Sequence, residues 1–233
     1  MTTFVLVHGA WAGSFGFRHV RRQLQASGHE VFTPSLTGIG ERVHLSSPQI
    51  SLSTHIQDVV NLVLYEDLND IVLLGYSYGG AVVTGCLEHI ANCIKHLVYL
   101  DAFLPRDGES VLSLVGMPPP TLTVGGPQFL PPPTRSFDDP SEAEFQNQRR
   151  VPQPMATGLE PVRLSQPVES FGFSRTYIRA TKGDPAEIGD SHFAEAAAHA
   201  QASEAWAYHE LATNHMVLSN KPKELAALLL GIA

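Results

Sequence analysis

Short apolar segments alternate with longer helical patterns through the first hundred residues, and this alternation restricts the fold more than any other feature. Runs rich in valine, leucine and isoleucine predict strands at 4–7, 30–32, 71–74 and 96–100. Between them, apolar residues recur every three or four positions, which predicts helices at 15–27, 53–66 and 78–91. Strands that are apolar throughout are buried on both faces, so the pattern indicates a parallel sheet between helices. The predicted fold class is therefore α/β and doubly wound.

The pattern stops after residue 100 and resumes near residue 174, so the chain carries an insertion. The second part predicts strands at 174–180 and 205–210 and helices at 191–202 and 221–230, for a sheet of about six strands. Between Asp101 and Ser170 lie 13 of the 17 prolines, which cannot donate to a sheet and which break helix interiors. We predict a core at 1–104 and 171–233 and a cap at 105–170, anchored over the mouth of the sheet by its apolar side chains. A disordered insertion is the alternative.

The charge balance excludes some classes of partner. The chain has 15 basic and 23 acidic residues in 233, for a formal net charge of −8. Nucleic acids and anionic membrane surfaces bind clustered basic residues, so we expect neither as a partner. The sequence has no apolar run of about 18 residues and does not begin like a signal peptide, so no membrane span is expected. With Cys86 and Cys93 as the two cysteines, we expect a reducing, cytoplasmic location.

Residues 75–79, Gly-Tyr-Ser-Tyr-Gly, form a G-x-S-x-G motif between a predicted strand and a predicted helix. The motif alone is weak, but a serine on a sharp strand-to-helix turn is the setting of a nucleophile elbow. Such a turn needs small residues two positions before and after Ser77, and Gly75 and Gly79 supply them. The first amides of the helix would point at an oxyanion formed beside the serine. Ser77 is the candidate nucleophile, and the alternative is that the glycines only serve a tight turn.

A serine nucleophile needs a histidine as base and a carboxylate that orients it. In folds with a nucleophile elbow, the acid and then the histidine follow the serine along the chain, at the ends of strands. His215 lies in the loop between the predicted strand 205–210 and the last helix, which makes it the candidate base. Two aspartates directly follow strands, Asp184 after 174–180 and Asp101 after 96–100. We predict Asp184 as the acid, with Asp101 as the second choice.

Five segments together resemble one enzyme family: FVLVHGAW (4–11), GHEVFTPSLTGIGER (28–42), GYSYGG (75–80), LVYLDAFLP (97–105) and NHMVL (214–218). They are similar to the α/β-hydrolase superfamily, and more narrowly to its branch of plant methyl-ester esterases, hydroxynitrile lyases and small bacterial relatives. The resemblance covers about 4–104 and 175–230 and implies a triad of Ser77, Asp184 in a T-x-x-D loop, and His215. It also implies an oxyanion hole made by the amides of Ala10 and Tyr78, and a homodimer.

The chain departs from this branch at two positions beside the triad. Tyr76 precedes the serine where many relatives carry histidine, and Asn214 precedes the histidine where the family has aspartate. The cyanohydrin-cleaving members resemble each other in having lysine after the catalytic histidine and threonine in the first oxyanion loop. This chain has Met216 and Ala10 there, so the resemblance favours an esterase over a lyase.

The function predicted from these residues is a serine carboxylesterase that works through an acyl-enzyme. We expect an apolar, aromatic substrate pocket formed by Trp11, Phe103, Phe129 and Met216, and a small or medium, mostly uncharged ester, lactone or carbamate as substrate. No cluster with metal-ligand spacing is present in the sequence, so we expect no metal and no organic cofactor. The alternatives are carbon–carbon cleavage of a cyanohydrin by the same triad, and a ligand-binding protein that hardly turns over.

Overall fold

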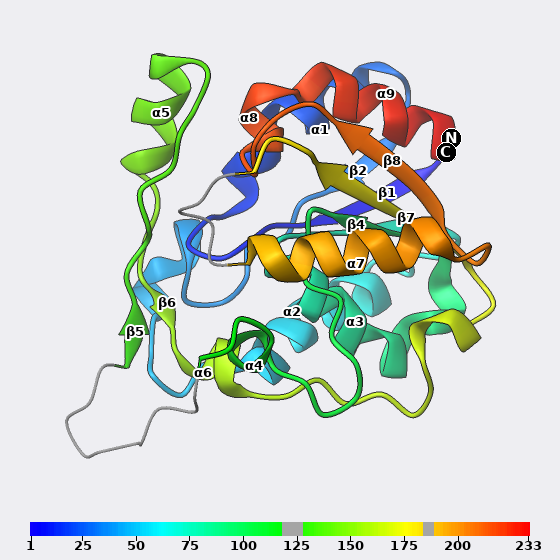
Figure 1. Cartoon of the computed structure of the whole chain (residues 1–233), viewed down its shortest axis with the longest axis horizontal. Helices are drawn as coiled ribbons and strands as arrows, with labels where there is room; N and C mark the ends of the chain where they lie inside the picture. Colours follow the sequence, from blue (N-terminus) through cyan, green and yellow to red (C-terminus); the bar gives the residue numbers. More distant parts are fainter. Residues whose placement is uncertain (118–127, 184–188) are drawn as a thin grey trace.

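The computed structural model describes residues 1–117, 128–183 and 189–233 and shows the α/β architecture expected from the alternating pattern (Figure 1). Six parallel strands form one sheet in the order β2-β1-β3-β4-β7-β8. They are β1 (Thr3–Val7), β2 (Glu30–Phe32), β3 (Ile71–Tyr76), β4 (Ile94–Leu100), β7 (Ser174–Ala180) and β8 (Ala207–Leu211). The main helices are α1 (Arg18–Ala26), α2 (Leu52–Tyr65), α3 (Gly79–Ile90), α7 (Asp190–Ala202) and α9 (Pro222–Ile232).

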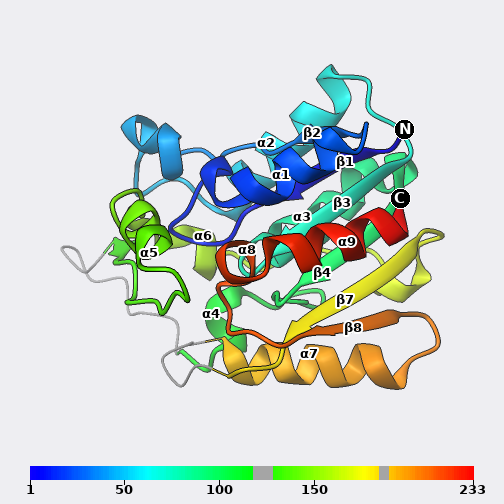
Figure 2. The same ribbon diagram turned by 90° about the horizontal axis from the view of Figure 1, so that it is seen from above.

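The central strands β1 and β3 are apolar because helices cover both faces of the sheet. Successive side chains of a strand point to opposite faces. Along β1, Val5 and Val7 pack into the cluster under α2, α3 and α7, whereas Phe4 and Leu6 pack into the cluster under α1 and α9. Figure 1 shows these two helical layers above and below the sheet, and Figure 2 shows α1 and α9 side by side on one of them. The parallel arrangement brings the carboxyl ends of all six strands to one edge.

Short helices connect these elements. They are η1 (Ser14–Phe17), η2 (Gly40–Leu45), η3 (Ala91–Cys93) and α8 (Val217–Asn220). The helix α8 is a single turn that directly follows the loop predicted to carry the base. The last two helices are therefore joined to the site by a short segment of chain.

The proline-rich insertion forms short elements in two places. They are α4 (Val111–Leu114), β5 (Phe129–Leu130), α5 (Pro140–Asn147), β6 (Gln153–Pro154), α6 (Ala156–Leu159) and η4 (Val168–Ser170). β5 and β6 pair antiparallel and, with α5, form an arm (residues 128–155) that stands to one side of the core in Figure 1. In contrast, α6 packs against α2 and α4. The limits 105 and 170 of the cap stay a prediction.

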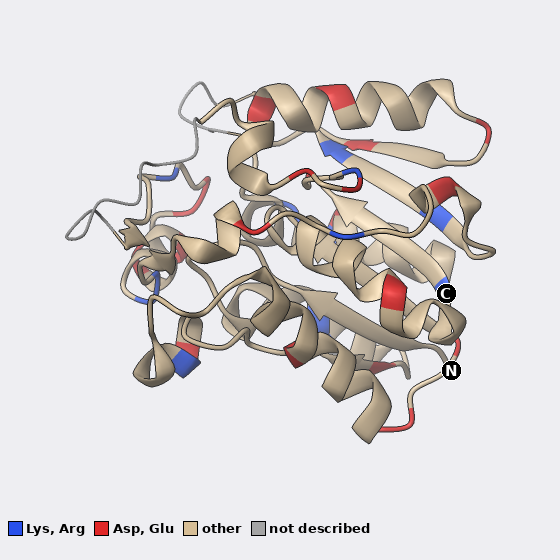
Figure 3. Ribbon diagram, turned by 90° about the horizontal axis from the view of Figure 1, so that it is seen from below, with Lys and Arg blue, Asp and Glu red and all other residues tan. Residues whose placement is uncertain are grey.

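Charged residues of both signs are distributed along the chain. In the ribbon of Figure 3, positions with Lys or Arg are interspersed with positions with Asp or Glu. Within the three described ranges, no helix has both the length and the apolar character that a transmembrane span needs.

Candidate active site

Ser77 lies on the turn between β3 and α3, as the motif predicts. Its φ of +55° is in the left-handed region, which a non-glycine residue keeps only when its surroundings hold it there. The amide of Ser77 donates to the carbonyl of Leu100 at 3.2 Å, and the amide of Phe103 donates to the carbonyl of Ser77 at 3.1 Å. A Cβ atom on Gly75 or on Gly79 would lie 2.6 Å from a backbone oxygen. The structure thus confirms that both positions must be glycine.

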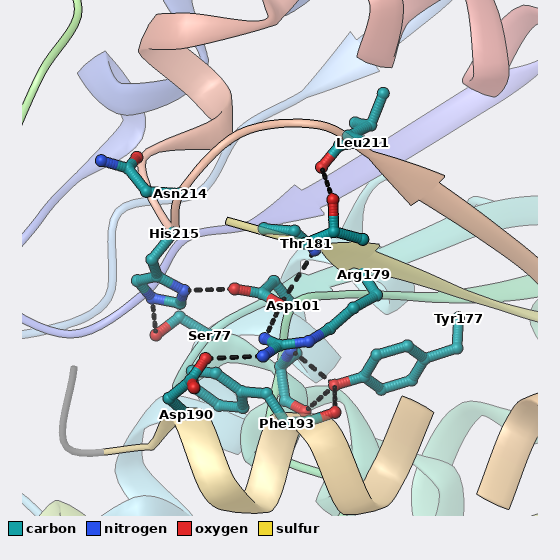
Figure 4. A network of polar contacts seen from close by, with 12 residues as sticks. Ser77, Asp101, Tyr177, Arg179, Thr181, Asp190, Phe193, Leu211, Asn214 and His215 are labelled. Carbon is teal, nitrogen blue, oxygen red and sulfur yellow. Dashed lines mark hydrogen bonds and ion pairs between the residues drawn. The ribbon is translucent and has the colours of Figure 1, made fainter. Parts of the chain in front are cut away.

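A continuous chain of hydrogen bonds joins Ser77, His215 and Asp101 (Figure 4). Nε2 of His215 lies 2.9 Å from Oγ of Ser77, and Nδ1 of His215 lies 2.7 Å from Oδ2 of Asp101. The three residues follow different strands: β3, β8 and β4 respectively. All three are buried, at 7%, 6% and 1% exposure. This is the geometry of a nucleophile, a base and an orienting acid.

The described carboxylate that contacts His215 belongs to Asp101, which was the second choice from the sequence. Asp184, the first choice, lies outside the described residues. Sheet order brings Asp101 to His215, because β4 is the immediate neighbour of β3. The residue that ends β4 therefore lies next to the nucleophile turn, and a φ of +42° at Asp101 turns the chain there.

Asp101 is held as an anion by an arginine that the sequence analysis missed. Oδ1 of Asp101 accepts hydrogen bonds from Nη1 of Arg179 and from the amide of Ala180, at 2.5 and 3.1 Å. Nη2 of Arg179 also donates to Asp190 at 2.6 Å, so the guanidinium bridges two carboxylates (Figure 4). Burial alone would raise the pKa of Asp101, but the hydrogen bond from His215 and the charges of His215 and Arg179 bring that pKa below its ordinary value.

Two aromatic rings stack on the imidazole of His215. The ring centroid of Tyr76 lies 5.0 Å from that of His215, and the ring centroid of Phe193, at the start of α7, lies 5.1 Å from it. The hydroxyl of Tyr76 also donates to the carbonyl of His215 at 2.6 Å. The tyrosine that departs from the family pattern therefore positions the base. In the sequence, this role was indicated only by the position of Tyr76 directly before Ser77.

The loop after β1 passes directly over the nucleophile. A Cβ atom on Gly9 would lie 2.9 Å from Cβ of Ser77, which places Ala10 at the edge of the site. His8 is fully buried and braces this loop, because its ring contacts the carbonyl of Gly9 and accepts from the amide of Leu36. Tyr78 lies at the first turn of α3, and its hydroxyl lies 2.9 Å from Nδ1 of His55.

Trp11 and Met216 line a small cavity at Ser77, as predicted, but Phe103 and Phe129 do not. The cavity has a volume of about 50 Å³. Phe103 is buried against His192 and Phe193, and so belongs to the core. Phe129 lies in β5, where its neighbour Leu130 accepts a hydrogen bond from Nε1 of Trp11 at 2.9 Å. The described lining consists of His8, Gly9, Ala10, Trp11, Ala12, Gly16, Tyr76, Ser77, Arg135, Phe137, Gln146, Arg150, His215, Met216, Leu218 and Ser219.

The cavity is more polar than the sequence analysis expected, because two arginines take part in its lining. Arg135 and Arg150 come from the proline-rich insertion, which has no periodicity that would predict an inward direction. No group of three or more His, Cys, Asp and Glu side chains within the described part of the chain could hold a metal ion. The lining thus combines Ser77, which is hydrogen-bonded to His215, with the side chains of two arginines.

The chain is similar to several known proteins. A model of the alpha/beta hydrolase family matches residues 4–228. The carbendazim hydrolyzing esterase of Nocardioides sp. is 36% identical over 247 aligned positions that span 100% of both chains. Methylesterase 1 of Arabidopsis thaliana is 31% identical over 133 positions, which are 55% of this chain and 51% of the relative.

Solved structures share the fold at low sequence identity. A methylesterase from Arabidopsis matches with a TM-score of 0.78 at 21% identity, over 100% of this chain and 98% of the other. An extracellular alpha/beta-hydrolase from a Paenibacillus species matches with a TM-score of 0.74 at 23% identity, over 99% and 98% of the two chains. Since the family model spans nearly the whole chain and the Nocardioides relative aligns from end to end, this protein belongs to the alpha/beta hydrolase family.

Proposed function

We propose that this protein is a serine hydrolase that cleaves small carboxylic esters through an acyl-enzyme. The observation that carries the proposal is the chain of hydrogen bonds from Ser77 through His215 to Asp101. The esterase names of two relatives, one of them similar over its full length, support the same reaction class. Carbendazim, the compound in the name of the Nocardioides relative, is a candidate substrate.

The first half of the reaction forms the acyl-enzyme. Nε2 of His215 takes the proton from Oγ of Ser77 while that oxygen attacks the carbonyl carbon of the ester. The oxyanion that results accepts hydrogen bonds from the amides of Ala10 and Tyr78, and such donors are worth about 10²–10³-fold in rate each. His215 then gives its proton to the departing alkoxide, which leaves as an alcohol.

The second half repeats these steps with water. His215 removes a proton from a water molecule, whose oxygen attacks the acyl carbon and releases the acid and the free serine. Through both halves, Asp101 accepts from Nδ1 of His215 and so fixes the tautomer that leaves Nε2 free to act as a base. Arg179 keeps Asp101 ionised for this task.

The test is mass spectrometry of the intact protein after treatment with a fluorophosphonate, together with a p-nitrophenyl acetate burst assay. We expect one covalent adduct and a burst of p-nitrophenol, and the loss of both in Ser77→Ala. Ser219→Ala is the matched control, because Ser219 lines the same cavity but contacts Gln146 and not His215. This control keeps the adduct.

Two outcomes would replace the proposal. Folded protein without an adduct would favour a ligand-binding protein with an inactive triad. Release of cyanide from a cyanohydrin without any burst on esters would mark the lyase alternative. An esterase that retains its activity in a clean Ser77→Ala preparation would contradict the mechanism itself.

A further inference from the structure

The loop that passes over the nucleophile contains a strained residue, Trp11. Its φ of +61° lies in the left-handed region, where a bulky residue stays only when its surroundings hold it there. Such strain is concentrated at functional sites. A Cβ atom on Gly9 would lie 2.9 Å from Cβ and 3.4 Å from Oγ of Ser77, so Trp11 lies two positions beyond a residue that packs against the nucleophile.

All three polar groups of Trp11 bond to the arm (residues 128–155). Its amide donates to Oε1 of Gln153 at 3.1 Å, its carbonyl accepts from the amide of Val151 at 3.1 Å, and its indole donates to the carbonyl of Leu130 at 2.9 Å. The partners come from β5 and from the segment around β6. The strained backbone of Trp11 is therefore held by the arm.

Among these partners, Gln153 is the one that acts through its side chain. It is 2% exposed, and its Nε2 donates to Oγ1 of Thr157 at 2.8 Å. A backbone amide can only donate, so the atom that faces the amide of Trp11 is the side-chain oxygen. Both ends of the Gln153 amide are bonded, which fixes its orientation. An apolar residue at this position would remove the acceptor.

On the other side of Ala10, a histidine of the core holds the chain. The carbonyl of Gly9 and the amide of Ala10 belong to one peptide group, which is planar and trans, so they point in opposite directions. Nε2 of His8 accepts from the amide of Leu36, so the proton of the neutral ring lies on Nδ1, which donates to Gly9 at 2.8 Å. Burial lowers the pKa of His8 and keeps the ring neutral.

The two peptide groups that flank the Cα atom of Ala10 are thus each held by a buried side chain. His8 holds the group before it, and Gln153 holds the group after it through the amide of Trp11. The direction of the Ala10 amide depends on both groups, because only the φ and ψ of Ala10 lie between them. The core alone fixes one of these two groups, and the arm fixes the other.

We propose that Gln153 is a positioning residue for the oxyanion hole, because it holds from the arm the loop whose Ala10 amide receives the oxyanion. This inference rests on the proposed ester hydrolysis. Gln153 is not among the described residues that line the cavity, so its effect on the reaction passes through Trp11. Oxyanion donors act only when they point at the place where charge develops, and a displacement of about 1 Å costs about 10²-fold in rate.

The test compares Gln153→Met with Gln153→Glu. Methionine matches the length of glutamine but has no oxygen for the amide of Trp11, whereas glutamate keeps an oxygen acceptor there in either protonation state. For p-nitrophenyl acetate we expect kcat in Gln153→Met to fall about 10–100-fold, with a change in KM of less than about 3-fold. In Gln153→Glu, kcat should return to within about 3-fold of the wild type, because the acceptor is restored.

Two further glutamines of the arm provide controls. Gln148 is exposed and donates to Glu144 in α5, so Gln148→Met should leave kcat and KM unchanged. Gln146→Met removes the bond of the arm to Ser219, so it loosens the arm away from the oxyanion loop and should act through KM. An unchanged kcat in folded Gln153→Met would overturn the inference. An equal fall of kcat in Gln146→Met, or in Gln153→Glu, would overturn it as well.

Thr157→Val replaces the main variant if Gln153→Met does not fold. It leaves Oε1 of Gln153 in place but removes the acceptor that fixes Nε2. The side-chain amide can then turn, so kcat should fall by a smaller factor, about 3–10-fold, again with little change in KM. An unchanged kcat in this variant would contradict the inference in the same way.

Hydrogen exchange, measured by mass spectrometry, gives a readout that needs no turnover. Because Gln153 holds the amide of Trp11, the segment 8–12 should exchange faster in Gln153→Met than in the wild type and in Gln148→Met. If the exchange changes in this way but no ester is hydrolysed, the reaction is wrong and the hold of Gln153 on the loop is right. If esters are hydrolysed and kcat in Gln153→Met equals that of the wild type, the inference is wrong and the reaction is right.

Discussion

The two sides of the cavity are held by different kinds of contact. The inner side includes Ser77 and, behind it, Asp101 and Arg179. These residues lie at the ends of neighbouring parallel strands, where backbone hydrogen bonds and a buried ion pair hold them. The outer side is the arm 128–155, which is attached to the core by one backbone bond, from Val151 to Trp11, by the ion pair of Arg18 with Glu142 and mainly by hydrogen bonds that involve side chains. They run from Trp11 to Leu130, from Asn214 to Ser136 and from Gln146 to Ser219.

We therefore expect the inner side to determine the rate of the chemical step and the outer side to determine which substrates bind. A change on the inner side disturbs groups that every substrate needs, so it should lower kcat for all esters alike. Apart from Gln153, a change on the outer side alters what the arm presents to the substrate and should act through KM. Variants on each side can therefore be ranked by the size and the kind of their effect.

The largest effect is expected for Asp101→Asn. The amide keeps the size of the side chain but favours the wrong tautomer of His215, which in serine proteases costs about 10⁴-fold in kcat. We expect kcat for p-nitrophenyl acetate to fall about 10³–10⁴-fold, with little change in KM. Asp184→Asn serves as the comparison and should lower kcat by less than about 5-fold. A larger loss at Asp184 than at Asp101 would restore the acid that the sequence favoured.

The next effect is expected for Arg179→Met, which removes the cation between Asp101 and Asp190. The Arg179 side chain is 10% exposed, and breaking a buried ion pair by removing one partner costs about 3–5 kcal/mol. We expect the free energy of unfolding, measured with urea, to fall by about this amount. In the double variant with Asp101→Asn, the loss should be smaller than the sum of the two single losses. Strictly additive losses would contradict the coupling.

The sequence predicts part of the inner side and little of the outer side. Ser77 follows the apolar run of β3, and His215 lies in the loop between β8 and the last helices, where the order serine, acid, histidine along the chain predicts the base. To choose between Asp101 and Asp184, one must know which strand lies beside β3. The order of the strands in the sheet differs from their order along the chain, so the sequence alone does not provide this. Arg179 sits in a buried strand where alternation alone predicts only an apolar neighbourhood.

The side chains of the outer side were not predicted for another reason. Arg135 and Arg150 belong to a segment with many prolines and two-residue strands, where no period indicates which side chains point inward. Their position depends on long-range contacts of the arm, such as the bond between Trp11 and Gln153. Phe103 was predicted to line the pocket but belongs to the core, because composition does not distinguish an aromatic side chain of the core from one of a pocket wall.

A third effect concerns stability on the inner side, where His55 supports Tyr78. His55 contacts the hydroxyl of Tyr78 and the carbonyl of Thr37, both at 2.9 Å, and burial lowers its pKa to about 4. Between pH 6.5 and 4 the unfolded chain therefore takes up a proton that the folded protein refuses. His55 should thus stabilise the fold fully above pH 6.5, and the free energy of unfolding should fall by about 3 kcal/mol as the pH decreases to 4. Urea titrations of the wild type and of His55→Gln at several pH values measure this. An equally steep decline in the variant would assign the effect to other groups.

The smallest effect, and the clearest one for the outer side, is expected for Asn214→Asp. The Oδ1 atom of Asn214 accepts from the amide of Met216 and from Asn220, and an aspartate would keep both bonds. Only the bond from Nδ2 to the carbonyl of Ser136, 2.9 Å long, would be lost, and a carboxylate would then face a carbonyl. The loss of this bond should weaken the attachment of the arm to the core by about 1 kcal/mol. The effect should reach the cavity, because Ser136 lies between Arg135 and Phe137, which both line it. We expect KM for p-nitrophenyl acetate to rise about 3–10-fold while kcat stays within about 2-fold. Initial-rate kinetics distinguish this from a role in catalysis, since a fall in kcat at constant KM would place Asn214 with the base on the inner side.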